Sequence, residues 1–186
     1  IGFMVWAEIP FISRFINTKE AKEDTVRQMR ELIMQNYNHP SICFWGISNE
    51  ITMGEESDEL VENQRILQKL CHKLDPSRKT VLANLTTVES QSEQNKITDL
   101  SAYNVYMGWY AGKVEDGGAW MDSLHKENSD MCMGISEYGA DTNVQYHSDA
   151  PKRQDYTEEY QSYYHEKMLQ AIQERPYLWC SFVWNM

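Results

Sequence analysis

Two glutamates follow apolar runs directly, where their carboxylates could act on a substrate. Glu50 ends the stretch "SICFWGISNE" (41–50), and Glu137 follows "CMGIS" (132–136). Each has a small polar residue just upstream and no lysine or arginine beside it in the sequence. Two carboxylates facing each other across a cleft can hydrolyse a glycosidic bond, since one protonates the leaving oxygen and the other attacks the anomeric carbon. An adjacent cation would hold the acid ionised, so its absence suits a proton donor.

Other polar and aromatic residues end the remaining apolar runs. Every strand must end in something polar, and for Glu8 or Asn84 alone that explanation is as good as a functional one. Taken together, these residues are carboxylates, amides, phenols and an indole, the groups that bind sugars. The run ends are Glu8, Ser48-Asn49-Glu50, Asn84, Asn104 with Tyr106, Ser136-Glu137-Tyr138, and Trp184 with Asn185.

The apolar runs alternate with segments of helical period, which predicts a parallel α/β fold. The runs are short, apolar on both faces and rich in aromatic or β-branched residues, as in a sheet covered on both sides. We expect strands at 3–9, 41–47, 79–85, 101–106, 132–138 and 178–184. We expect helices at 19–37, 56–74 and 156–174, a shorter one near 118–128, and at best a weak helix within the polar segment 86–98. Thr18 can cap the first helix, and Ser57 or Asp58 the second.

The spacing of residues in the expected helices also predicts which side chains face the core. In 19–37 the expected buried face holds Ala21, Val26, Met29, Leu32, Ile33 and Asn36. In 56–74 it holds Leu60, Ile66, Leu67, Leu70, Cys71 and Leu74.

Repeated strand–helix units fit either an open doubly wound sheet or a (β/α)8 barrel. The sequence contains no glycine-rich phosphate loop of the kind that often accompanies open nucleotide-binding sheets. A complete barrel needs eight strands and typically about 250 residues, whereas six strands are predicted here. In both architectures ligands bind at the carboxyl ends of the strands, where the polar residues above are expected.

Composition narrows the classes of partner. The 186 residues, 41% of them hydrophobic and 24% charged, fit a single globular domain. A net charge of −11 argues against nucleic acid, and the apolar stretches are too short to cross a membrane. The four cysteines, Cys43, Cys71, Cys132 and Cys180, are widely spaced, which favours buried small side chains over disulfides or zinc ligands. The chain opens on Ile1, so we expect an excerpt of a longer polypeptide, and its localisation is not indicated.

The residues resemble a known family. The segments "GFMVWAEIP", "NHPSICFWGISNE", "AYNVYMGWY", "GISEYGADT" and "LWCSFVWNM" are similar, in order and spacing, to successive strands in the catalytic barrel of glycoside hydrolase family 2. The resemblance implies an incomplete (β/α)8 TIM barrel over 1–186, with about six βα units that correspond to barrel strands three to eight. The first two strands and the family's N-terminal sandwich domains would be absent.

The resemblance also implies roles for individual residues. Glu50 would be the general acid/base and Glu137 the nucleophile, with Tyr106 holding the carboxylate of Glu137. Asn49 would bind the substrate 2-hydroxyl and Trp184 would line the sugar subsite. Weaker matches are Asn104, Trp109, Glu8 and His39, the last being more readily a turn residue within "NHP".

The resemblance implies a retaining exo-β-glycosidase with a carbohydrate substrate. The segment "AYNVYMGWY" favours a β-galactosidase, while "SEYGADT" with "TEEYQ" is similar to β-glucuronidases, which are the alternative. A non-catalytic carbohydrate-binding barrel is a second alternative. No cofactor is expected, and no metal, because "EIPFISRF" lacks the Glu-x-His that binds magnesium in some members. Open barrel edges predict self-association.

Overall fold

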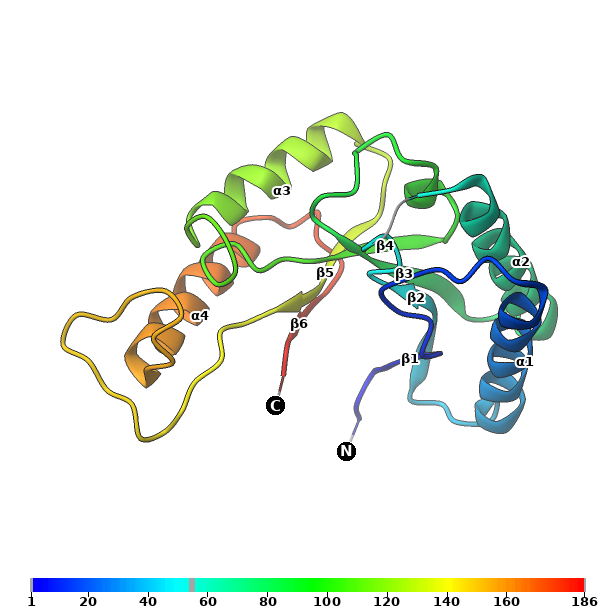
Figure 1. The fold of residues 1–186 in the computed structure, drawn as a ribbon, viewed down its shortest axis with the longest axis horizontal. Coiled ribbons are helices and arrows are strands. Elements are labelled where there is room, and N and C mark those ends of the chain that lie inside the picture. The colour runs from blue at the N-terminus through cyan, green and yellow to red at the C-terminus, as the bar shows by residue number, and fades with distance from the viewer. Residues whose placement is uncertain (1, 54–55, 186) are drawn as a thin grey trace. The chain divides into compact units, whose positions relative to one another are not determined.

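Strand–helix alternation is present along the chain, as the apolar runs and helical periods predict. The computed structural model describes residues 2–53 and 56–185. The chain divides into two compact units, 1–102 and 103–186, and strand β4 (Leu100–Asn104) crosses the boundary between them. Each unit alternates strands with helices (Figure 1).

Unit 1 contains three parallel strands in chain order, joined by two long helices. Its elements are β1 (Val5–Glu8), α1 (Lys19–Asn36), β2 (Ile42–Asn49), α2 (Asp58–Leu74), β3 (Lys79–Leu85) and the 3-10 helix η1 (Glu93–Lys96). β1 pairs with β2, and β2 with β3. Helices α1 and α2 lie side by side (Figure 1) and pack against each other. Their apolar faces form one core with β2, centred on Ile33, Trp45, Ile47 and Leu67, all fully buried.

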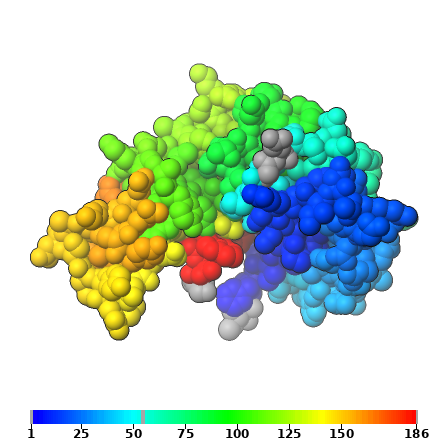
Figure 2. All heavy atoms as spheres, viewed as in Figure 1, coloured from blue at the N-terminus to red at the C-terminus, as the bar shows by residue number. Residues whose placement is uncertain are grey.

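Unit 2 repeats the pattern after the end of β4. Its elements are α3 (Asp116–Glu127), β5 (Met133–Tyr138), α4 (Glu158–Gln173) and β6 (Ser181–Val183), and β5 pairs in parallel with β6. Tyr103, Ile135 and Tyr164 lie at the centre of its core. The segment 139–157, yellow in Figure 2, lies beside the start of α4, in orange. The backbone N–H of Asn143 donates to the carbonyl of Tyr156 (2.8 Å), which closes this segment on itself.

Three hydroxyl side chains begin the long helices. The side chains of Thr18, Ser57 and Thr157 accept hydrogen bonds from backbone N–H groups three residues further on, which otherwise have no partner within the helix. Thr18 caps α1 as predicted. Ser57 rather than Asp58 caps α2, and Asp58 is the first helical residue, where its negative charge suits the helix N-terminus.

The predicted elements match the observed ones with small shifts at their ends. Within 86–98 the only regular element is η1, because Ser92 caps a single 3-10 turn there. Ile66 is exposed, contrary to the prediction, and the polar Asn63 and Gln64 are buried instead. Of the four cysteines expected to be buried, Cys71 is buried, Cys43 and Cys180 are partly buried, and Cys132, which directly precedes β5, is exposed. All four cysteines are free thiols. None of the helices in the described ranges is both long and apolar enough to span a membrane.

Candidate active site

The end of β2 places Asn49 and Glu50 on a firmly held stretch of backbone. The N–H of Asn49 donates to the carbonyl of Phe11 (3.0 Å), and the N–H of Glu50 donates to the carbonyl of Ala83 (2.9 Å). The carbonyl of Asn49 accepts from Ser13 (3.2 Å). The segment after β1 and strand β3 therefore fix this stretch from both sides.

Two backbone irregularities precede and include Glu50. Gly46 pairs with Val81 and Asn49 pairs with Ala83, so β2 uses three steps where β3 uses two. Such a bulge redirects the side chains that follow it, and bulges are frequent next to active sites. Glu50 itself has a φ of 48°, in the left-handed region that non-glycine residues seldom adopt. The carboxylate direction at the end of β2 is therefore set by a locally irregular backbone.

Gly46 makes room for two side chains of β1. A Cβ at this position would lie 2.3 Å from Nε1 of Trp6 and 2.4 Å from Cβ of Glu8. Both distances are far below van der Waals contact, so only glycine fits here without displacing its neighbours. The apolar run of β2 thus lacks a side chain where β1 brings Trp6 and Glu8 against it.

Unit 2 contains three of the predicted site residues, Glu137, Tyr106 and Asn104, near the ends of β4 and β5. The Tyr106 hydroxyl donates to a carboxylate oxygen of Glu137 (2.7 Å), the hydrogen bond that the family resemblance implies. The N–H of Val105 donates to the backbone carbonyl of Glu137 (2.7 Å). Ser136 donates through Oγ to Oδ1 of Asn104 (2.6 Å), and Asn104 is buried. The ends of β4 and β5 are therefore joined by two side-chain hydrogen bonds, Tyr106 to Glu137 and Ser136 to Asn104.

The two predicted tryptophans differ in their surroundings. Trp184 follows β6 with 55% of its surface exposed, and its backbone N–H donates to the carbonyl of Tyr138 (2.9 Å). Trp109 is only 2% exposed and packs edge-on against Tyr156, at 5.2 Å between ring centroids. Trp184 is thus largely exposed and its role in the sugar subsite stays a prediction, whereas the observed contacts of Trp109 are those of a core residue. Its role as a substrate contact stays a prediction.

The remaining weak match, His39, lies in a turn. Its N–H donates to the carbonyl of Asn36 (3.0 Å), and its own carbonyl accepts from Ile42 (3.2 Å) and from the guanidinium of Arg78 (3.0 Å). These backbone hydrogen bonds join the end of α1 to the start of β2. They agree with the interpretation of His39 as a turn residue within "NHP".

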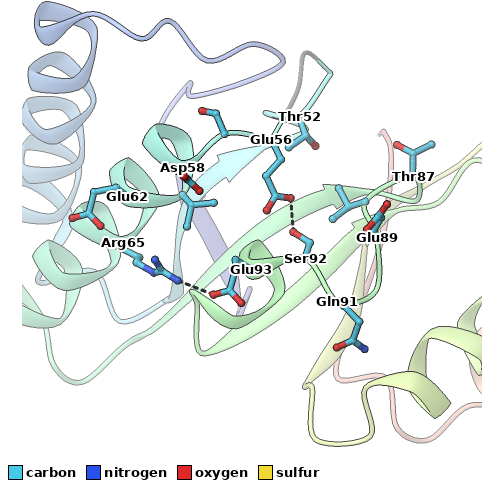
Figure 3. Close-up of a pocket in the computed structure, with 13 residues that line it drawn as sticks. Thr52, Glu56, Asp58, Glu62, Arg65, Thr87, Glu89, Gln91, Ser92 and Glu93 are labelled. Atoms are coloured by element: carbon cyan, nitrogen blue, oxygen red, sulfur yellow. Dashed lines mark hydrogen bonds and ion pairs between the residues drawn. The ribbon is translucent and has the colours of Figure 1, made fainter.

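A hollow of about 950 Å³ opens in unit 1 beside the loop that follows Glu50. Figure 3 shows side chains from this loop, from α2 and from the segment after β3 around it. Two interactions join residues that line this hollow. Ser92 Oγ donates a hydrogen bond to Glu56 (2.5 Å), and Arg65 forms an ion pair with Glu93 (2.8 Å). The sequence did not predict this hollow. Among the described residues no group of three or more histidine, cysteine or acidic side chains is placed to hold a metal ion.

A buried polar network, which the sequence did not predict, is joined to this hollow through Glu56. Gln64 on α2 donates to Ser48 Oγ (3.0 Å) and to Gln94 Oε1 (3.0 Å), and all three residues are buried. Gln94 in turn donates to Glu56 (3.2 Å). The available signal was a polar residue, Gln64, at a position of the helix where the spacing from Leu60 and Leu67 places it near the buried face.

Comparison with known families agrees with these observations. The model described as "Glycosyl hydrolases family 2, TIM barrel domain" matches residues 4–185. The chain belongs to this family. The expected fold class, an incomplete (β/α)8 barrel of strand–helix units, is thereby confirmed.

Relatives within the family are mostly named for one activity. The chain is 37% identical to a beta-glucuronidase of Bacteroides fragilis, over 100% of this chain and 28% of that protein. It is 54% identical, with a TM-score of 0.97, to the crystal structure of an FMN-binding beta-glucuronidase from Facaelibacterium prausnitzii L2-6, over 100% of this chain and 29% of that one. A beta-galactosidase of Thermoanaerobacterium thermosulfurigenes is 34% identical over 43% of this chain and 10% of its own length. The chain thus spans under a third of the length of each of these three relatives.

Proposed function

We propose that this chain is the catalytic part of a retaining β-glycosidase that acts on β-glucuronides. The observation that supports the chemistry best is the 2.7 Å hydrogen bond from Tyr106 to Glu137. A donor on a carboxylate favours its ionised form, which is the form a nucleophile needs. Glu50, the other half of the proposed pair, follows the bulge at the end of β2.

The proposed reaction has two displacements. In the first, a carboxylate oxygen of Glu137 attacks the anomeric carbon while Glu50 gives its proton to the leaving oxygen, so that the aglycone departs as an alcohol. In the second, Glu50 takes a proton from water, and the resulting hydroxide equivalent breaks the glycosyl ester and restores Glu137. Asn49 and Asn104 would bind sugar hydroxyls, and Trp184 would stack on the ring. These steps use two carboxylates and water and require no redox cofactor.

Among the family's activities, we favour glucuronide hydrolysis over galactoside hydrolysis. The segment "AYNVYMGWY" had favoured β-galactosidase, with β-glucuronidase as the alternative. The B. fragilis and F. prausnitzii relatives cover the whole chain and are named beta-glucuronidase. A beta-galactosidase relative covers 43% of it, and a structure described as a putative beta-galactosidase of B. fragilis covers 98% of it at a lower identity, 33%. The alternative is therefore the better supported of the two, and the sugar carboxylate would be recognised in the complete enzyme.

A panel of nitrophenyl β-glycosides tests the substrate assignment. An active enzyme that contains this chain should hydrolyse the glucuronide at least about a hundredfold faster, in kcat/KM, than the galactoside or glucoside. Equal or greater activity on the galactoside would restore the β-galactosidase reading. In the same enzyme, Glu137→Gln should abolish turnover of every substrate, and retained hydrolysis would remove Glu137 from the nucleophile role.

Covalent labelling distinguishes a catalytic enzyme from a non-catalytic carbohydrate-binding barrel. A 2-fluoro sugar with a good leaving group should label Glu137 in an enzyme, because the slowed second displacement traps the ester. A binding protein would leave the sugar unreacted. The mass of the labelled peptide identifies the residue.

Two further expectations from the sequence stay predictions. No metal is proposed for catalysis, and activity that fell with a chelator and returned with magnesium alone would contradict this. Self-association through open sheet edges would show as a dimer in light scattering of the isolated chain, and a monomer at high concentration would contradict it.

A further inference from the structure

Three features of β2 converge on the residues just before Glu50. The strand gains one step over β3 between Gly46 and Asn49. Glu50 has a φ of 48°. Ser48, a hydroxyl residue that is 1% exposed, lies within the extra step and two residues before Glu50. Irregular backbone of this kind is unfavourable and persists only where surrounding contacts enforce it.

Main-chain hydrogen bonds hold part of this irregular backbone in place. Phe11 and Ala83 accept from the N–H groups of Asn49 and Glu50, as described above. These bonds fix the backbone after the bulge. Both bonds lie on the Glu50 side of Ile47 and Ser48, the two residues at which the extra step is made.

The side chain that reaches the bulge comes from α2. Gln64 is fully buried, and its Nε2 donates to Ser48 Oγ at 3.0 Å. The second proton of the same amide is directed to Gln94 Oε1, also at 3.0 Å. Because both protons of Nε2 are engaged, the amide cannot turn without breaking two buried hydrogen bonds. Gln94 is tied in turn to Glu56 (3.2 Å), in the loop that follows Glu50.

We propose that Gln64 is a positioning residue for the acid/base Glu50, acting through Ser48 to hold the β2 bulge in the form that aims the carboxyl group at the leaving oxygen. The inference rests on the proposed function, since it assumes that Glu50 is the proton donor. Gln64 sits on the helix behind the strand and contacts Ser48 rather than the carboxylate.

Leaving-group dependence distinguishes this role from general stabilisation. A glycoside with a poor leaving group, such as phenol, needs the proton from Glu50, whereas a dinitrophenolate departs without it. A displaced Glu50 should therefore slow the phenyl glycoside and spare the dinitrophenyl glycoside of the same sugar. Loss of folded enzyme would slow both equally.

The test compares Gln64→Met with Asn63→Leu in an active enzyme that contains this chain. Each substitution replaces a buried amide on α2 with an apolar side chain of similar length. Asn63 donates instead to Thr25 Oγ1 on α1 (3.3 Å), which makes it the matched control. Both amides also have a carbonyl oxygen without a hydrogen-bond partner among the described residues, so the polar groups removed are alike.

We expect Gln64→Met to lower kcat/KM for the phenyl glycoside by about tenfold or more and for the dinitrophenyl glycoside by less than about twofold. Ser48→Ala, a milder change, should give the same pattern, and the double variant should be no worse than Gln64→Met. Asn63→Leu should show no difference between the two substrates.

Two results would overturn the inference: equal losses on both substrates for Gln64→Met and Ser48→Ala, or no loss for either variant. Glu50→Gln calibrates the measurement, because it should show the strongest leaving-group dependence. If Glu50→Gln shows the dependence and the Gln64 and Ser48 variants do not, only the positioning role fails. If Glu50→Gln slows both substrates equally, the acid/base assignment fails, and the positioning role fails with it.

Discussion

The hydroxyl of Tyr106 and the carboxylate of Glu137 are joined by a 2.7 Å hydrogen bond between the ends of β4 and β5. The two side chains come from segments that are distant in the sequence, and their strands bring them together in the second unit of the chain. The bond gives the carboxylate a fixed hydrogen-bond donor, so it links the fold of unit 2 to the proposed nucleophile.

Tyr106→Phe should therefore lower kcat by about a hundredfold, because the nucleophile loses a fixed donor while the ring remains in place. Steady-state kinetics on a nitrophenyl glycoside measures this. Tyr163→Phe is the matched control, since the Tyr163 hydroxyl also bonds to a carboxylate, that of the exposed Glu115. A kcat for Tyr106→Phe close to that of the control would contradict the assignment.

Gly46→Ala should destabilise unit 1 by about 1–3 kcal/mol and reduce activity, because the new Cβ would lie 2.3 Å from Trp6 and 2.4 Å from Glu8. Thermal unfolding followed by tryptophan fluorescence measures the loss. Gly2→Ala is the control, since a Cβ there meets no atom within 4 Å. If both variants melted together with the parent, the close approach of β1 to Gly46 would be wrong.

Asp75 should make the start of β2 sensitive to acid. Burial opposes its ionised form, but hydrogen bonds from Ser77, Arg78 and Trp45 prevail and lower the pKa of Asp75 from 3.8 to about 2. A lowered folded pKa means that the stabilisation is complete above the unfolded value near 3.8 and is lost as the pH falls towards about 2. The shift corresponds to about 2 kcal/mol.

Asp75→Asn should remove that acid-dependent contribution and weaken the neutral-pH structure around Trp45. Hydrogen–deuterium exchange of 42–49 should rise at neutral pH in the variant and change less between about pH 4 and pH 2 than in the parent. An unchanged exchange profile would show that the buried carboxylate does not hold this strand.

The segment 139–157 should loosen as the pH rises. A hydrogen bond from the exposed His147 to Glu159 (2.9 Å) raises the pKa of that histidine above 6.5, and Glu158 adds to the effect. A raised folded pKa means that the contribution is complete below 6.5 and is lost as the pH passes the folded value. Exchange of 139–157, corrected for intrinsic rates, should increase between about pH 6 and pH 8. His147→Gln should abolish the increase, and a parent profile flat in pH would contradict the prediction.

Local sequence signals predicted the elements of this chain closely. The runs and caps of 19–37 and 79–85 gave α1 and β3 to within a residue, because short-range spacing and a hydroxyl cap suffice to define them. The motifs around Glu50 and Glu137 predicted the family, and the Tyr106 contact followed from that resemblance. Ile66 and Cys132 were misplaced, since burial depends on which neighbour covers a side chain and not on its own polarity.

The amino-acid sequence by itself determined the alternation of strands and helices, the family, and the two candidate carboxylates. Only the tertiary structure decided that β2 carries a bulge before Glu50, that Gly46 is required by Trp6 and Glu8, and that Gln64 reaches Ser48. The physical reason is the distance along the sequence over which each signal acts. Periodicity and caps are set by residues within a few positions, whereas a bulge, a close approach and a buried amide bond depend on side chains that meet only when strands and helices pack.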